Sequence, residues 1–125
     1  MDKAQALHSF WSSFKVGTKP VPAYDSNTVP TGAGFPRITY DVATDSFGQP
    51  VLLSASIWDK NYSWVRAEEL ASDVSDLLGM GGLNIAYTDG MLWLKRGTPF
   101  AQRMGDEDDS IRRIVINIEA EFIGG

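Results

Sequence analysis

The side chains that most often perform catalysis are few in this sequence and widely separated. His8 is its one histidine and there is no cysteine, so neither a Ser–His–Asp nor a Cys–His nucleophile system is visible. Asp41, Asp45 and Asp59 fall on expected strands and turns, and the sequence places no two of them across a cleft, as paired-carboxylate hydrolysis requires. We therefore expect no catalytic residues and no enzymatic activity.

The remaining candidate ligand sites are an acidic run at residues 106–109 and a pair of glycines. The acidic run lacks the alternating spacing, the central glycine and the closing glutamate of a calcium loop. Gly32 and Gly34 lack the third glycine of a dinucleotide fingerprint and do not lie between a strand and a helix, where phosphates would meet a helix N-terminus. The sequence therefore predicts no metal site and no bound cofactor.

A further set of residues is better suited to contact than to catalysis. Two expected strands are separated by residues 97–110, a connection of roughly fourteen positions that is far longer than an ordinary hairpin loop. This connection carries Phe100 and Met104 together with Arg103 and four acids. We interpret it as a contact arm, and a mobile surface loop with a solvated charge run is the alternative.

The overall composition limits the kinds of partner that the protein can have. The chain has 125 residues and a net charge of −5, which argues against a general nucleic-acid binder but lets DNA pass nearby without sticking. No apolar run approaches the roughly 20 residues of a membrane span, and the N-terminus lacks a secretory signal pattern. We expect one domain over residues 1–125, soluble, made in the cytoplasm and not bound to a membrane.

Two helices are expected from apolar residues at three- and four-residue spacing. The first covers residues 2–14, capped by Asp2 and ended by Gly17, and its aromatic stripe packs on its own core or docks on a neighbouring subunit. The second covers residues 63–78 between caps at Ser63 and Gly79, with Arg66 on its water-facing side. Residues 18–36 hold four prolines and should form no regular element, as either an ordered loop or an arm.

Five strands complete the expected pattern, at residues 37–45, 51–58, 83–88, 91–96 and 111–123. The first two should pair through a turn at residues 46–50, and Asp89-Gly90 predicts a tight turn between the next two. The last strand would span around 40 Å, so its surplus length either hangs free or pairs across an interface. This order predicts an α+β domain: a mostly antiparallel sheet of about five strands with two helices packed on one face.

Three large side chains near the strand ends each have two possible roles. Trp58 lies on the otherwise polar face of its strand, so it needs a cover from this chain or from a partner chain. Arg112 and Arg113 follow the acidic run, and they either pair with local charges or make a salt-sensitive contact with a neighbour.

Several short stretches carry a resemblance to a known family of structural proteins. They are Ile38-Thr39-Tyr40, Asp45-Ser46-Phe47-Gly48, Ser54-Ala55-Ser56-Ile57-Trp58, Arg96-Gly97-Thr98-Pro99-Phe100, Gln102-Arg103-Met104, Ile111-Arg112-Arg113-Ile114 and Glu121-Phe122. In these residues the chain resembles the tail-terminator proteins of long-tailed bacteriophages and prophages, which are also described as minor capsid or head–tail joining proteins. The run from Arg96 to Met104 is the most specific piece, and residues 1–35 match only in general character.

The resemblance implies a small α+β domain that assembles as a ring, usually a hexamer, on the end of the tail tube. Such a ring stops tube polymerisation, provides the docking surface for the head and lets DNA pass through its lumen. It implies as partners other copies of the chain, the major tail tube protein and a head connector or stopper protein. The expected location is the neck of the virion, after assembly in the host cytoplasm.

The residues that we expect to contact a neighbouring subunit or the tail tube are Phe100, Gln102, Arg103, Met104, Arg112, Arg113 and Trp58. Two other functions are considered. The first is a head-side connector, a stopper or head-completion protein of the same neck. The second is a binding or regulatory module that is unrelated to virions.

Overall fold

The computed structural model describes residues 1–43 and 49–124 of the chain. Its elements, in chain order, are α1 (Lys3–Trp11), β1 (Lys15–Val16), β2 (Lys19–Pro20), β3 (Ala23–Asp25), β4 (Arg37–Tyr40), β5 (Val51–Lys60), α2 (Val65–Leu78), β6 (Leu83–Tyr87), β7 (Gly90–Met104) and β8 (Ile111–Ile123). The expected turn at residues 46–50 lies largely outside the described residues, as does Asp45.

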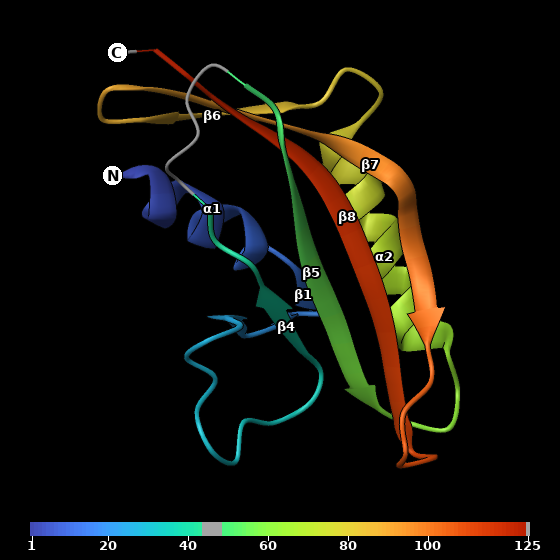
Figure 1. Ribbon diagram of the computed structural model, residues 1–125. Coiled ribbons are helices and arrows are strands. Elements are labelled where there is room, and N and C mark those ends of the chain that lie inside the picture. The colour runs from blue at the N-terminus through green and yellow to red at the C-terminus, as the bar shows by residue number, and fades with distance from the viewer. Residues whose placement is uncertain (44–48, 125) are drawn as a thin grey trace.

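A curled sheet of six strands, in the order β3-β4-β5-β8-β7-β6, organises the molecule (Figure 1). Every neighbouring pair is antiparallel except β3 and β4, which are parallel. Both helices contribute buried side chains to one core with the inward-facing residues of the sheet. The expected α+β fold is therefore confirmed. The extra strand is β3, and β1 and β2 form a separate hairpin, so regular structure does occur within residues 18–36.

The strand β8 lies in the middle of the sheet and is paired along its whole length. It pairs with β5 from Ile111 to Ala120 and with β7 from Arg113 to Ile123. The expectation of surplus strand length was wrong because β7, with 15 residues, extends much further than the pattern indicated. Figure 1 shows β8 crossing the molecule from the β7–β8 turn at the bottom to the C-terminus at the upper left.

The prediction of a long loop is also wrong, because residues 97–104 continue β7 after an interruption. Arg96 pairs with Ile118 and Ala101 pairs with Ile116, so four residues of β7 lie opposite Asn117 alone. This bulge is held by a hydrogen bond of 2.9 Å from Asn117 Nδ2 to the Pro99 carbonyl oxygen. The connection that remains between β7 and β8 is residues 105–110.

Helix α1 packs on the chain's own core. Its side chains Leu7, Phe10 and Trp11 are buried, and the rings of Phe10 and Trp11 lie 4.8 Å apart. The expected Asp2 cap is present: its carboxylate accepts a hydrogen bond of 2.8 Å from the Gln5 amide. The helix ends at Trp11, before the predicted end, and Gly17 takes a positive φ beyond it, in the tight β1–β2 hairpin.

Helix α2 spans Val65–Leu78 and is followed by Gly79 as its C-terminal cap, as predicted, but it begins two residues later than the predicted start at Ser63. Trp64 is the N-terminal flanking residue, and the Ser63 hydroxyl accepts a hydrogen bond of 3.2 Å from the Val65 amide. Among the described residues, no helix is both long and apolar enough to cross a membrane.

The β6–β7 hairpin differs from the prediction by one residue. Tyr87 pairs with Gly90, so the two turn residues are Thr88 and Asp89. A Cβ atom at Gly90 would lie 2.2 Å from the Ile123 carbonyl oxygen. Gly90 is therefore required by this close approach of β8 rather than by the turn.

Candidate interaction surfaces at the hairpin end of the sheet

A row of large side chains crosses the outer face of the sheet, the face turned away from the helices. Register places Arg37 of β4, Trp58 of β5, Arg113 of β8 and Met104 of β7 side by side. The Arg113 guanidinium lies 4.5 Å from the centre of the Trp58 ring, and that of Arg37 lies 5.9 Å from it. The indole nitrogen of Trp58 donates a hydrogen bond of 2.9 Å to Thr39 Oγ1. This chain therefore supplies part of the cover that Trp58 needs, and the ring stays partly exposed.

A second arginine–tryptophan cluster lies on the other face, where the β7–β8 hairpin meets the start of α2. Arg103 and Arg112 lie 4.6 and 5.3 Å from the Trp64 ring centre. Arg103 Nε donates a hydrogen bond of 2.7 Å to a carboxylate oxygen of Glu68. Arg112 Nη2 donates one of 2.9 Å to the Tyr62 carbonyl oxygen. This cluster ties the hairpin to the helix, with cation–π contacts adding to hydrogen bonds.

Arg112 and Arg113 are therefore separated by the alternation of β8, and they act on opposite faces of the sheet. Arg112 donates hydrogen bonds to backbone carbonyl oxygens, including a bond of 2.8 Å from Nη1 to Asp109. Arg113 Nε donates one of 3.1 Å to Ser56 Oγ. In the described part of the chain neither arginine makes an ion pair, so local charge pairing, one of the two alternatives for these residues, is absent there.

The other predicted contact residues lie along the last part of β7. Phe100 is half-buried and packs against the core, whereas Gln102 is exposed on the outer face beside Val115. Met104 is 38 % exposed, a large value for an apolar side chain on a sheet. The structure thus brings Met104, Arg113 and Trp58 together on one face and places Arg103 and Arg112 on the other.

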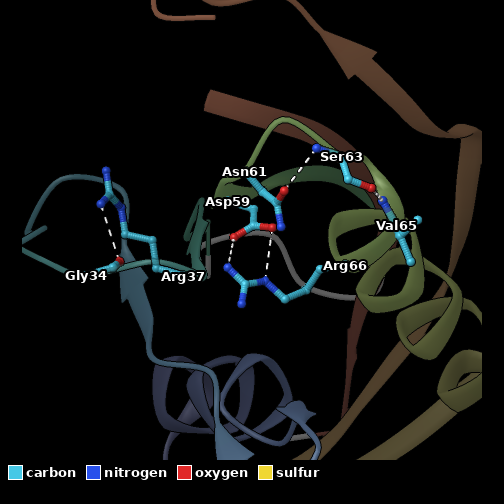
Figure 2. Close-up of polar contacts among 7 residues, drawn as sticks. All are labelled: Gly34, Arg37, Asp59, Asn61, Ser63, Val65 and Arg66. Atoms are coloured by element: carbon cyan, nitrogen blue, oxygen red, sulfur yellow. Dashed lines mark hydrogen bonds and ion pairs between the residues drawn. The ribbon is translucent and has the colours of Figure 1, made fainter. Parts of the chain in front are cut away.

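The structure contains one ion pair that was not predicted from the sequence. Asp59 is fully buried on the inward face of β5, and Arg66 of α2 binds both of its carboxylate oxygens, with Nε donating over 3.0 Å (Figure 2). The hydrogen bond to Asp59 raises the pKa of Arg66. The signal was available in the sequence, because Asp59 continues the inward alternation of Leu53, Ala55 and Ile57.

The outer face carries a hollow of about 340 Å³ above the middle of β5. It is lined by Ser26, Val29, Arg37, Thr39, Asp41, Ser54, Ala55, Ser56, Trp58, Arg113 and Val115. Arg37 Nη1 donates to the carbonyl oxygens of Ala33, at 2.9 Å, and Gly34, the latter drawn in Figure 2. Arg37 Nε is buried and has no hydrogen-bond partner among residues 1–43 and 49–124. The hollow therefore combines two cations, one carboxylate, one aromatic ring and several hydroxyl groups.

The acidic run forms an exposed, internally braced turn at the end of the β7–β8 hairpin. Asp106 Oδ1 accepts a hydrogen bond of 2.9 Å from the Asp108 amide. Asp108 Oδ1 accepts bonds from the Ser110 amide, at 2.9 Å, and hydroxyl, at 2.6 Å. These bonds to Ser110, with a smaller contribution from the charge of Lys60, lower the pKa of the Asp108 carboxyl. In residues 1–43 and 49–124, no three His, Cys, Asp or Glu side chains converge to hold a metal ion.

Comparison with protein-family models and with the sequences of curated proteins gives no match. One solved structure does match, a chain of the "Virion of native gene transfer agent (GTA) particle". The two chains superpose with a TM-score of 0.68 and 21 % sequence identity, over 98 % of this chain and 95 % of that chain. This protein therefore shares its fold, almost from end to end, with a chain of a virion particle.

Proposed function

We propose that this protein is a structural component of a virion neck, a tail terminator that forms a ring on the end of the tail tube. The observation that carries the proposal is the match over 98 % of the chain to a chain of a virion particle. The resemblance of residues 96–104 to tail-terminator proteins supports the same function independently of the overall fold.

The proposed activity is assembly rather than catalysis. A ring of identical subunits requires head-to-tail contacts that close on themselves. Here the β7–β8 hairpin offers exposed residues at its end, among them Gln102 and Met104, and the acidic turn beyond them. The finished ring would occupy the growing end of the tube and leave its opposite surface for the head. A net charge of −5 for each subunit would weaken adhesion to DNA in the lumen, because phosphates and acidic side chains repel each other.

The test is electron microscopy of particles from a phage or prophage in which this gene is disrupted, with the intact gene supplied in trans as the control. If the protein is a tail terminator, the disrupted strain should give abnormally long or irregular free tails beside full heads. The complemented strain should give normal tails. Free tails of normal length beside heads that leak DNA would overturn the assignment and favour the head-side connector. Intact infectious particles from the disrupted strain would show that the protein is not a required component of the neck.

The contact residues are tested by substitution in the same system. Phe100→Ala combined with Arg103→Ala should reproduce the tail defect if these side chains contact a neighbouring subunit or the tube. Because Phe100 is also half-buried against the core, the variant must be compared with the wild-type protein by circular dichroism. A folded double variant that supports normal tails would refute a contact role for these two residues.

A further inference from the structure

Among the residues that the structure describes, the two arginines of the outer hollow have no carboxylate partner. In the described part of the chain, the ion pairs are Arg66–Asp59, Lys95–Glu119 and Arg103–Glu68. Arg37 and Arg113 donate instead to uncharged oxygens, and Arg37 Nε, although buried, donates to none. The acid in the lining, Asp41, accepts a hydrogen bond of 2.9 Å from Ser26 Oγ. Because Arg37 Nε has no acceptor among the described residues, this guanidinium does not use all of its donors within the described part of the chain.

The position of these arginines suits an acidic ligand. They lie on either side of Trp58 in one cross-strand row, so their guanidinium groups are held by cation–π contact. A guanidinium presents several donors in a fixed plane and binds carboxylates in a bidentate manner. Contact with the indole ring also limits the water around each charge, which strengthens attraction to a carboxylate. The hollow is thus arranged to receive carboxylates.

The chain itself carries a segment with the matching chemistry. Residues 106–109 supply four carboxylates in sequence, all four residues are exposed, and none of them makes an ion pair in the described structure. Hydrogen bonds within the turn hold its backbone in one shape, at Asp106–Asp108 and Asp108–Ser110. A turn that is already ordered loses less conformational entropy on binding.

We infer that the hollow formed by Arg37, Trp58 and Arg113 receives the acidic turn, residues 106–109, of a second copy of this chain. The inference rests on the proposed ring and identifies one contact that would build it. Within the proposed ring this contact is heterologous: each subunit gives its turn to one neighbour and accepts a turn from another. The occupant is a second copy because the described turn makes no ion pair with its own hollow, while its charge complements that of the hollow.

Disulfide crosslinking tests this contact directly, because the natural chain has no cysteine. One copy would carry Glu107→Cys in the turn, and a second, epitope-tagged copy would carry Val29→Cys in the lining of the hollow. Particles assembled from both copies should give a covalent dimer after mild oxidation. The matched control replaces Val29→Cys with Ser9→Cys, at an exposed position on α1, and should give no dimer above background.

Charge reversal tests whether attraction drives the contact. Arg113→Glu alone, or Glu107→Lys with Asp109→Lys, should each lower the yield of correctly tailed particles by about tenfold or more, as expected for a broken charge contact. Combining all three substitutions in one chain should restore most of the yield, because the charges would again be complementary. Lys15→Glu, at an exposed position of β1 outside the β7–β8 hairpin and the hollow, is the control for a change in net charge.

The outcomes separate this inference from the proposed function. Particles that contain the protein in a ring but give no dimer, or folded variants without rescue, would overturn the turn-in-hollow contact and leave the terminator function intact. A crosslink from Val29→Cys to a different virion protein would also overturn it. A specific dimer in particles whose tails keep their length after gene disruption would uphold the contact and overturn the terminator function.

Discussion

The guanidinium of Arg66 binds both carboxylate oxygens of Asp59, which is 0 % exposed at the end of β5. This pair joins helix α2 to the sheet next to the residues that lead into the helix, where Asn61 Oδ1 accepts a hydrogen bond from the Ser63 amide (Figure 2). A charge buried on an inward sheet face is tolerated because its partner is fixed opposite to it. The first prediction follows from this arrangement.

Replacement of Arg66 by methionine should lower the free energy of unfolding by about 3 kcal/mol, because it leaves the Asp59 carboxylate buried and unpaired. The value lies at the lower end of the usual range because Arg66 is partly exposed and water screens the pair. Urea denaturation followed by circular dichroism measures it. The double variant Asp59→Leu with Arg66→Met should be more stable than Arg66→Met alone, and the opposite order would contradict this explanation.

The bulge of β7 gives a second prediction. A Cβ atom at Gly97 would lie 2.8 Å from the Asn117 carbonyl oxygen, whereas a Cβ atom at Gly105 would meet nothing within 4 Å. Gly97→Ala should therefore cost about 1–3 kcal/mol of stability by crowding the backbone of β8. Gly105→Ala is the matched control and should change stability by less than about 0.5 kcal/mol. Equal unfolding midpoints for the two variants would show that the bulge is not tightly packed.

The pair of Arg103 and Glu68 allows a structural role to be separated from a contact role. Both side chains are about half exposed, so either Arg103→Ala or Glu68→Ala should cost less than about 1 kcal/mol. If Arg103 contacts a neighbouring subunit or the tube, Arg103→Ala should reduce tail assembly and Glu68→Ala should not. Thermal unfolding and particle counts on the same two variants provide the measurements. Equal assembly defects in the two variants would show that Arg103 acts only by holding α2 through Glu68.

The ionisation of the Tyr40 hydroxyl should make the stability of the fold depend on pH in alkali. Burial, together with the nearby Asp25 carboxylate, raises the pKa of the Tyr40 hydroxyl. The folded state then holds this proton more tightly than the unfolded chain, so the stabilisation is complete below the unfolded pKa of about 10 and is lost as the pH rises through the higher folded pKa. Urea denaturation at a series of alkaline pH values should show this loss in the wild-type protein.

The variant Tyr40→Phe is the control for that experiment. It should be about 1 kcal/mol less stable at neutral pH, because it loses the hydrogen bond of 2.7 Å between the Tyr40 hydroxyl and His8 Nδ1. Its stability should fall less steeply in alkali than that of the wild-type protein. Parallel curves for the two proteins would show that another group causes the alkaline loss.

Much of the sheet and the longer helix could be predicted from local patterns. The strict alternation from Ile114 to Phe122 defines β8, and the apolar spacing of residues 67–78 defines α2. The strand β7 could not be predicted whole, because its bulge reverses the alternation: Leu92 and Leu94 face inward before it, and Ala101 and Arg103 share that face after it. A pattern that changes phase resembles the end of a strand. The three-residue strand β3 depends on parallel pairing with β4, which no local signal carries.

The candidate surfaces were predictable only as a list of residues. Alternation along β8 is enough to place Arg112 and Arg113 on opposite faces. The prediction from sequence nevertheless gave the two arginines one shared role. The partnership of Arg37 with Trp58 required the register between β4 and β5, and the hollow required the segment around Ser26 and Val29 to fold over them. Side chains brought together by long-range contacts leave no spacing rule in the sequence.

The complete pairing of β8 has a mechanical consequence. Its hydrogen bonds to β5 and β7 run across the strand direction, as in any antiparallel sheet. A pull along β8, between the acidic turn and the C-terminal end, would load these bonds in shear, so many would have to break together. The subunit should therefore be stiffest along this axis, and it would transmit a force from one end of the strand to the other with little stretching.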